Sequence, residues 1–242
     1  MALYGLSAAY FINAVTYLPM ILVMFVLRID EEEPHPSSRD PYLSQLLEGL
    51  RYTRDHAPIR QVILLAAVSN FFGRGVIELM PAFAALIFAG GTGELAVLMA
   101  AAGVGAILAS LLFSSRTFGA HLHQIVVVGA IGVGLSTLMF AFVGNLVTGV
   151  IVVALLGLFT SFVAIGSQTE VQVSVENRLR ARVMSMWTIT IVGGPAIGSA
   201  VAGALAGWIG STYTSLGFAV ACLLLIAVVG IANPRTARNP EV

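Results

Sequence analysis

Two charged residues lie deep within one apolar run of the sequence, Arg74 and Glu78. They are one helical turn apart, so a helix would place both on the same face, together with Asn70 one turn earlier. A charge at the centre of a bilayer costs about 2.5–3.5 kcal/mol on insertion scales, so such residues face a protein interior or a wet cavity. One interpretation is a self-neutralised pair that only locks helix packing. We favour the other, a substrate or proton pathway through Asn70, Arg74 and Glu78.

A second polar group is predicted near the end of another apolar run, which carries Thr160, Ser161, Ser167 and Gln168. Hydroxyl groups in a spanning helix often donate to the backbone of their own helix, and we expect this of Thr160 and Ser161. An amide is costlier to bury without partners. Gln168 is therefore the second candidate for lining a cavity.

Prolines and small residues predict where the helices bend and where they approach one another. Pro81 follows the charged pair in the same run and would free backbone carbonyl groups, which lets a helix bend. Lipid supplies no hydrophobic drive between helices, so small residues one turn apart favour close backbone contact. Such pairs are Gly105 and Ala109, Gly194 and Gly198, and Gly203 and Gly207.

The remaining reactive side chains do not form an enzyme site. All three aspartates, Asp30, Asp40 and Asp55, lie outside the apolar runs, which excludes an intramembrane aspartyl pair. The one cysteine, Cys222, lies inside an apolar run, where a thiol behaves as a small hydrophobe and has no partner for a disulfide. We therefore expect no catalytic residue, no enzyme activity and no cofactor.

The histidines give only a weak indication of a metal. They are His35, His56, His121 and His123, all in connectors or at their edges. The last two are close in sequence, but two imidazoles without a neighbouring carboxylate or thiolate are poor support for a metal site. We expect an exposed interfacial pair at His121 and His123 and no bound metal.

The composition requires a bilayer around most of these residues. Of the 242 residues, 58% are hydrophobic and only 10% are charged, and the mean hydropathy is +0.94. An ordinary soluble domain carries roughly a quarter charged residues. A membrane span needs about 20 mostly apolar residues. The sequence therefore predicts an all-α membrane protein of about seven spans: Ala2–Leu27, Arg60–Phe88, Glu94–Ser115, Gln124–Val143, Leu146–Gln168, Val183–Ala206 and Thr212–Ala232.

The arginines predict the orientation of these spans, since positive connectors stay in the cytoplasm. Every basic residue is Arg, and apart from Arg74 they fall in or beside alternate connectors or in the tail: Arg28, Arg39, Arg51, Arg54, Arg60, Arg116, Arg178, Arg180, Arg182, Arg235 and Arg238. The other three connectors contain none. We therefore predict an outside N-terminus and a cytoplasmic C-terminus.

The first connector is long and has two parts. An acidic, proline-rich stretch from Asp30 to Pro41, which reads as a solvated linker, precedes an apparent short helix. In that helix Leu43, Leu46, Leu47 and Leu50 recur at helical spacing, with Arg51, Arg54 and Asp55 on the other side. We favour an interfacial anchor over a hinge or docking element.

Two segments, Asn70–Ala84 and Gly166–Trp187, resemble the major facilitator superfamily, in particular its bacterial efflux branch of siderophore and macrolide exporters. The stretch Arg180–Ser185 is the most specific part. The family has twelve helices in two halves joined by a long cytoplasmic loop, and the resemblance implies helices six to twelve here. Residues 1–27 would be helix six, 28–59 the central loop, 60–232 the C-terminal six-helix bundle and 233–242 a cytoplasmic tail.

The resemblance also implies roles for particular residues. The helices of Arg74 and Gln168 would be the seventh and tenth, which line the central cavity. The stretch Gly193–Gly198, with Gly194 and Pro195, is similar to a glycine–proline signature of antiporters, where it bends a helix. Arg116 and Gly119 keep part of a gating motif in the loop between helices eight and nine, but histidines stand where arginines are expected and no acid is present.

The expected function is therefore secondary, proton-coupled export of small amphiphilic molecules across the inner membrane, by the C-terminal half of a transporter. Alternating access needs two halves, so the partners implied are the lipid bilayer, a small-molecule substrate and the missing N-terminal half, with no nucleic acid. We rank a fragment of a complete exporter first, then a degenerate gene product, then a half-transporter. A seven-helix ligand-sensing receptor is the alternative, although a retinal-type one would need a lysine for its Schiff base.

Overall fold

The computed structural model describes residues 2–26, 42–78, 80–81, 92–114 and 121–231. The chain divides into two compact units, Met1–Asp40 and Pro41–Val242. The first unit contains α1 (Ala2–Val26), a helix of 25 residues with Pro19 inside it. At 1.5 Å per residue it is roughly 38 Å long, which is enough to cross the roughly 30 Å of bilayer hydrocarbon. Its start and end agree with the predicted first span.

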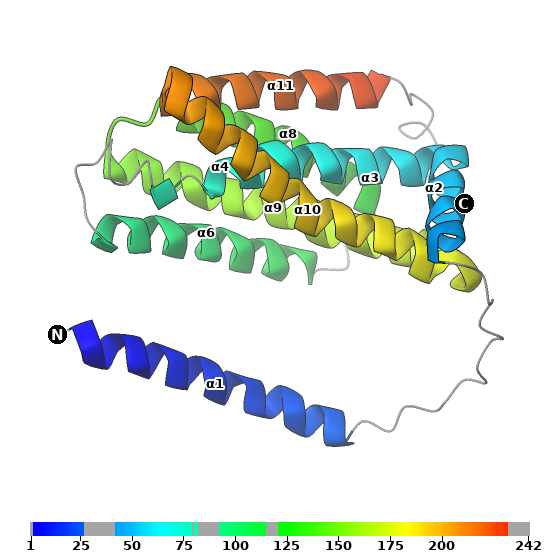
Figure 1. The fold of residues 1–242 in the computed structure, drawn as a ribbon, viewed down its shortest axis with the longest axis horizontal. Helices are drawn as coiled ribbons and strands as arrows, with labels where there is room; N and C mark the ends of the chain where they lie inside the picture. Colours follow the sequence, from blue (N-terminus) through cyan, green and yellow to red (C-terminus); the bar gives the residue numbers. More distant parts are fainter. Residues whose placement is uncertain (1, 27–41, 79, 82–91, 115–120, 232–242) are drawn as a thin grey trace. The chain divides into compact units, whose positions relative to one another are not determined.

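The second unit is a helical bundle (Figure 1). Its elements are α2 (Tyr42–Asp55), α3 (Ala57–Ser69), the π-helix η1 (Asn70–Arg74), α4 (Gly75–Ile77), α6 (Thr92–Phe113), α8 (Leu122–Phe140), α9 (Leu146–Ser174), α10 (Asn177–Ile209) and α11 (Ser211–Ile231). Helices α6, α8, α9, α10 and α11 are each long and apolar enough to cross a membrane. With α1 and the broken segment α3–η1–α4, they confirm an all-α membrane protein of about seven helices.

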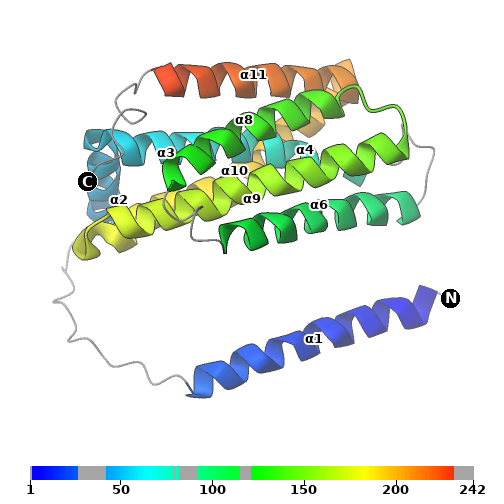
Figure 2. The same cartoon turned by 180° about the vertical axis from the view of Figure 1, so that it is seen from behind.

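Helix α9 lies at the centre of the bundle and packs against both α6 and α8, as Figure 2 shows from behind. Small residues permit the closest contact: a Cβ added to Gly105 of α6 would stand 2.7 Å from the backbone nitrogen of Leu158, and one added to Gly157 of α9 would stand 2.9 Å from the carbonyl carbon of Ala102. The predicted contact at Gly105 and Ala109 is confirmed, because Ala109 is fully buried.

The predicted close contact at Gly203 and Gly207 of α10 is wrong for the described bundle. A Cβ on Gly207 would meet nothing within 4 Å, and Gly203 is exposed as well. Only 11% of the most apolar stretch of α10 is buried, against 50% for α8. Gly203 and Gly207 therefore face outward rather than toward a described helix of this unit.

The hairpin of α9 and α10 differs from the prediction. Instead of a connector from residue 169 to residue 182, the turn is confined to Val175 and Glu176, and both helices extend about two turns towards it. The predicted spans were too short because the residues in these extensions are polar, so the mean hydropathy falls before the helices end. At 29 and 33 residues the two helices are roughly 44 and 50 Å long, so both reach beyond a bilayer core.

Helix α2 runs across the ends of the spanning helices, near the α9–α10 turn (Figure 1). It is held there by Gly49, where a Cβ would stand 2.9 Å from the backbone oxygen of Arg182, and by an ion pair between Glu48 and Arg182. The side chain of Arg60 donates to the backbone oxygen of Arg54, 2.6 Å away. Arginines from α2, α3 and α10 thus gather at one end of the bundle.

Candidate functional site: a charged face on the broken helix

The predicted polar stripe lies on the segment where the helix changes type. Residues Asn70–Arg74 form a π-helix turn between α3 and α4, which the residue pattern did not indicate. Single π turns inside α-helices occur frequently at functional sites. Arg74 and Glu78 are both exposed, and so is Pro81 further along. Asn70 is 4% exposed, and its Nδ2 donates to the backbone oxygen of Ala66 at 2.8 Å.

Arg74 and Glu78 do not neutralise each other. The backbone nitrogen of Glu78 donates to the backbone oxygen of Arg74 at 3.2 Å, so the chain is still helical between them. Among the ion pairs formed by the described residues, however, none joins these two side chains. The interpretation as a self-neutralised pair is therefore not what the structure shows. Each charge is presented outward by itself.

Helix α10 fixes the backbone of this segment from behind. A Cβ on Gly198 would stand 2.9 Å from the carbonyl carbon of Phe71, and a Cβ on Gly75 would stand 2.9 Å from the carbonyl carbon of Gly198. Gly194 lies opposite Asn70, with 3.4 Å between its Cβ position and the Cβ of Asn70. The prediction of a close contact at Gly194 and Gly198 is confirmed. Pro195 lies between them, half-buried inside a helix that continues through it.

Gln168 does not lie at the level of the charged face, which is formed by Arg74 and Glu78. Gly73, beside Arg74, faces α9 at Thr160, with 3.8 Å between its Cβ position and the Cγ2 of Thr160. Gln168 is about two turns further along α9, or roughly 12 Å, and is partly exposed. The Oγ1 of Thr160 donates to the backbone oxygen of Leu156 at 2.8 Å, as predicted for a hydroxyl in a spanning helix.

A polar bridge next to Gln168 was not predicted. The indole Nε1 of Trp187 on α10 donates to the Oγ of Ser167 on α9 at 2.9 Å, and Ser167 is fully buried. Indole N–H groups usually find a partner when buried. The sequence contains both residue types, but no spacing rule connects residues on different helices.

The prediction for the histidine pair was partly wrong. His121 is exposed, as expected, but His123 is only 21% exposed and its Nδ1 lies 3.1 Å from Oε1 of Glu170 on α9. The sequence analysis missed the carboxylate of Glu170 because it is 47 positions from His123. Among the described residues, no group of three or more potential ligands could hold a metal ion.

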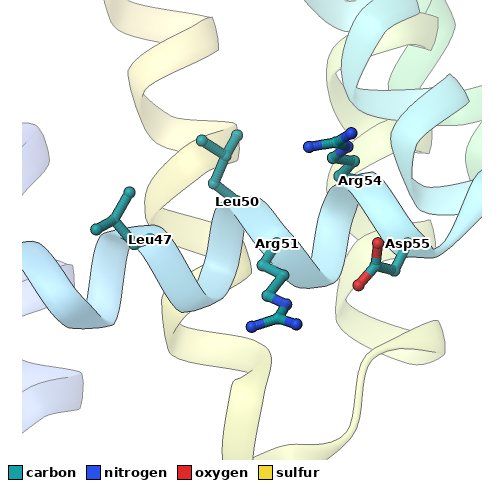
Figure 3. A pocket seen from close by; sticks show the side chains of 5 residues that line it. All are labelled: Leu47, Leu50, Arg51, Arg54 and Asp55. Carbon is teal, nitrogen blue, oxygen red and sulfur yellow. The ribbon is translucent and has the colours of Figure 1, made fainter.

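The outward face of α2 carries two leucines between charged residues. Leu47 and Leu50 are 58% and 53% exposed, and with Arg51, Arg54 and Asp55 they line an open groove (Figure 3). In Figure 3 the two leucines and Arg54 point to one side of the helix, and Arg51 and Asp55 to the other. Arg51 and Asp55 lie opposite the leucines as predicted, whereas the prediction for Arg54 is wrong, because it lies on the same side as the leucines. Its bundle side consists of Gly49, the partly buried Tyr52 and the buried Thr53.

Residues 1–239 match the family model described as transmembrane secretion effector. The chain belongs to this family of major facilitator transporters. Curated relatives agree with the family. The chain is 25% identical over 231 residues to the enterobactin exporter of Citrobacter koseri, which covers 94% of this chain and 53% of that protein. It is 26% identical over 231 residues to the enterobactin exporter of Salmonella typhi, with 94% and 53% covered.

The chain thus spans about half the length of the curated relatives that it matches. Arg116 and Gly119, which the family resemblance predicts to be part of a gating motif, lie outside the described residues. Arg74, Glu78 and Asn70 share one segment, and Gly194 packs against it. Family membership shows that this chain is a multi-pass membrane protein. The roles of its individual residues stay predictions.

Proposed function

We propose that the chain acts as the C-terminal part of a secondary exporter of small amphiphilic molecules. In this proposal residues 1–27 correspond to helix six, residues 28–59 to the central loop, residues 60–232 to the second six-helix bundle and residues 233–242 to the tail. Family membership and the half-length match to two enterobactin exporters support it. Those exporters suggest enterobactin as the first molecule to test.

The observation that carries the proposal is the outward exposure of Arg74 and Glu78 on a segment predicted to cross the membrane, with no ion pair between them among the described residues. Arg74 and Glu78 cannot face hydrocarbon without the cost of a buried charge, so a second protein surface or a wet cavity must cover them. Transporters of two halves place the substrate site near the midplane between the halves. The charged face would then line that site from this half.

Rigid support of this face favours a binding role over a chance exposure. Gly75, Gly198 and Phe71 bring the backbones of the broken helix and α10 together without intervening side chains. A close backbone contact leaves little freedom for the π turn to shift. Arg74 and Glu78 are therefore presented from a fixed scaffold, as a binding site requires.

We also propose the orientation with the N-terminus outside and the C-terminus in the cytoplasm of an inner-membrane protein. It is supported by the arginines at the α2 end of the bundle, because positively charged connectors are retained in the cytoplasm. The end that carries α2 and the α9–α10 turn would be cytoplasmic. Cysteine-accessibility labelling at Asp55 and Trp208, at opposite ends, would test it.

The central experiment replaces Glu78 by Gln in the complete protein and measures efflux. Loss of export with unchanged membrane insertion is expected, because Gln keeps the size of the side chain and removes its charge. Glu176→Gln is the matched control, since Glu176 is an exposed residue at the α9–α10 turn with no side-chain cap bond. Retained export with normal pH dependence in Glu78→Gln would refute the proton role of Glu78. Equal loss in both variants would show that the effect is not specific to the charged face.

A further inference from the structure

Leu47, Leu50 and Arg54 form one outward face of α2. They stand at positions i, i+3 and i+7, which a helix brings to the same side, and Figure 3 shows the three side chains on that side. All three are exposed. Together with Arg51 and Asp55 they line an open groove of about 530 Å³. The described residues therefore leave uncovered a face that combines apolar side chains with a guanidinium group.

The groove carries a net positive charge. Its lining contains two arginines and one carboxylate, and no ion pair between described residues includes Arg51 or Arg54. Nη1 of Arg60 donates to the backbone oxygen of Arg54 at 2.6 Å, which brings another guanidinium close to the end of the face. Charge complementarity therefore favours an anionic occupant.

Helix α2 lies at the level where the headgroups of a bilayer are expected. It runs across the ends of the spanning helices, near the α9–α10 turn (Figure 1). Helices α9 and α10 are roughly 44 and 50 Å long, whereas the hydrocarbon of a bilayer is about 30 Å thick. Their extra turns are the polar ones next to Val175 and Glu176, on the α2 side. This end of the bundle therefore extends into the headgroup layer.

Contacts on the opposite side of α2 hold the face outward. Gly49 packs against the backbone of Arg182, Glu48 forms an ion pair with Arg182, and Thr53 is buried. With this side fixed on α10, the helix cannot turn Leu47 and Leu50 toward the bundle. Their apolar surface must be covered from outside the unit or stay in water.

We propose that this face of α2 binds one anionic phospholipid of the adjacent leaflet. The lipid phosphate accepts hydrogen bonds from Arg54, because a guanidinium and a phosphate can form two such bonds at once, and the first carbons of the acyl chains lie on Leu47 and Leu50. The face is roughly 10 Å long, and a phospholipid carries an anionic phosphate and apolar chains this close together. A plain interfacial anchor would bind any bilayer lipid, whereas Arg54 beside the leucines selects an anionic headgroup. The proposal does not rest on the export function.

Native mass spectrometry of the 242-residue chain tests the site. The chain is released from detergent that contains equal amounts of phosphatidylglycerol and phosphatidylcholine, and the lipids retained on it are counted. We expect phosphatidylglycerol to be retained preferentially. Arg54→Gln should lower its ratio to phosphatidylcholine about fivefold, as for the loss of one arginine near an anionic surface, and Arg54→Lys should keep most of the preference. An unchanged ratio in Arg54→Gln would overturn the proposal.

Arg178→Gln is the matched control for charge. Arg178 is exposed in the first turn of α10, at the same end of the bundle, and does not line the groove. The variant therefore changes the net charge equally and should retain lipids as the unaltered chain does. Equal loss of preference in Arg54→Gln and Arg178→Gln would contradict a site at the groove, because overall charge would then explain the preference.

The apolar part of the face has its own variant. Leu50→Ser should weaken the retention of both lipids without changing their ratio, whereas Val173→Ser, at an exposed position near the end of α9, should not. Unchanged retention in Leu50→Ser would contradict the acyl-chain contact.

Two soluble competitors distinguish a bilayer lipid from other anionic occupants of the groove. Displacement of the retained phosphatidylglycerol by millimolar glycerol phosphate would assign the groove to a free phosphate compound. Its displacement by a peptide made of glutamate would assign the groove to an acidic protein partner. Either result would overturn the lipid assignment, and retention in the presence of both competitors is expected.

Discussion

Replacing Gly198 by Ala tests whether the close crossing of α10 and the π turn supports the charged face. The added Cβ would stand 2.9 Å from the carbonyl carbon and 3.2 Å from the Cα of Phe71, whereas ordinary contact begins at 3.4 Å. The nearest atom is the carbonyl oxygen of Phe71, which the added Cβ would overlap. The helices must therefore separate by roughly 1 Å or more at this point, since backbone atoms cannot rotate away. Such overpacking typically costs about 1–3 kcal/mol.

The expected result is a lower midpoint of thermal unfolding for the chain in detergent. For a protein of this size, each kcal/mol shifts the midpoint by about 2–4 °C. Export by the complete protein should fall as well, because Arg74 and Glu78 move with the backbone of Phe71. Both effects share one cause, so they should appear together.

Gly207→Ala on the same helix is the matched control. A Cβ there meets nothing within 4 Å, so the substitution adds the same methyl group without a clash. Helix propensity alone favours Ala over Gly by up to about 1 kcal/mol, so stability should stay the same or rise slightly. Equal midpoints for the Gly198 and Gly207 variants would refute the argument that the crossing is tightly packed.

Two further predictions concern the other end of the bundle. Ser167→Ala removes the acceptor of the Trp187 indole and should lower the free energy of unfolding by about 1–3 kcal/mol, with a shift of the tryptophan emission that Ser161→Ala does not cause. If the outward face of α2 is an interfacial anchor, a fluorophore on Leu47→Cys should be quenched by brominated lipids more strongly than one on Asp55→Cys, which points to the other side in Figure 3. Equal quenching at the two positions would favour a docking element instead.

The predictions from sequence were accurate where one helix alone determines the outcome. The apolar runs located the spans, because a bilayer requires about 20 consecutive apolar residues whatever their neighbours are. Helix α2 followed from the spacing of its leucines, and the contacts at Gly105 and Gly198 followed from small residues one turn apart. Such patterns repeat within a few residues, so they can be read along the chain.

The predictions failed where the outcome depends on residues far apart in the sequence. Glu170 is 47 positions from His123, so no local pattern connects them. The pair at Gly203 and Gly207 has the same spacing as Gly194 and Gly198, yet only the second pair has a helix of the bundle against it. Small residues permit a close contact, but they do not supply the partner.

The sequence by itself determined that Arg74 and Glu78 lie one helical turn apart inside an apolar run, because hydropathy and charge are properties of the residues themselves. Only the tertiary structure decided that the helix forms a π turn there, that α10 locks its backbone, and that the two charges point outward without pairing. The physical reason is that packing between helices selects among local conformations of nearly equal energy. Arg74 and Glu78, which are close enough in sequence to pair, therefore form no ion pair with each other and lie exposed on a segment whose backbone is held by α10.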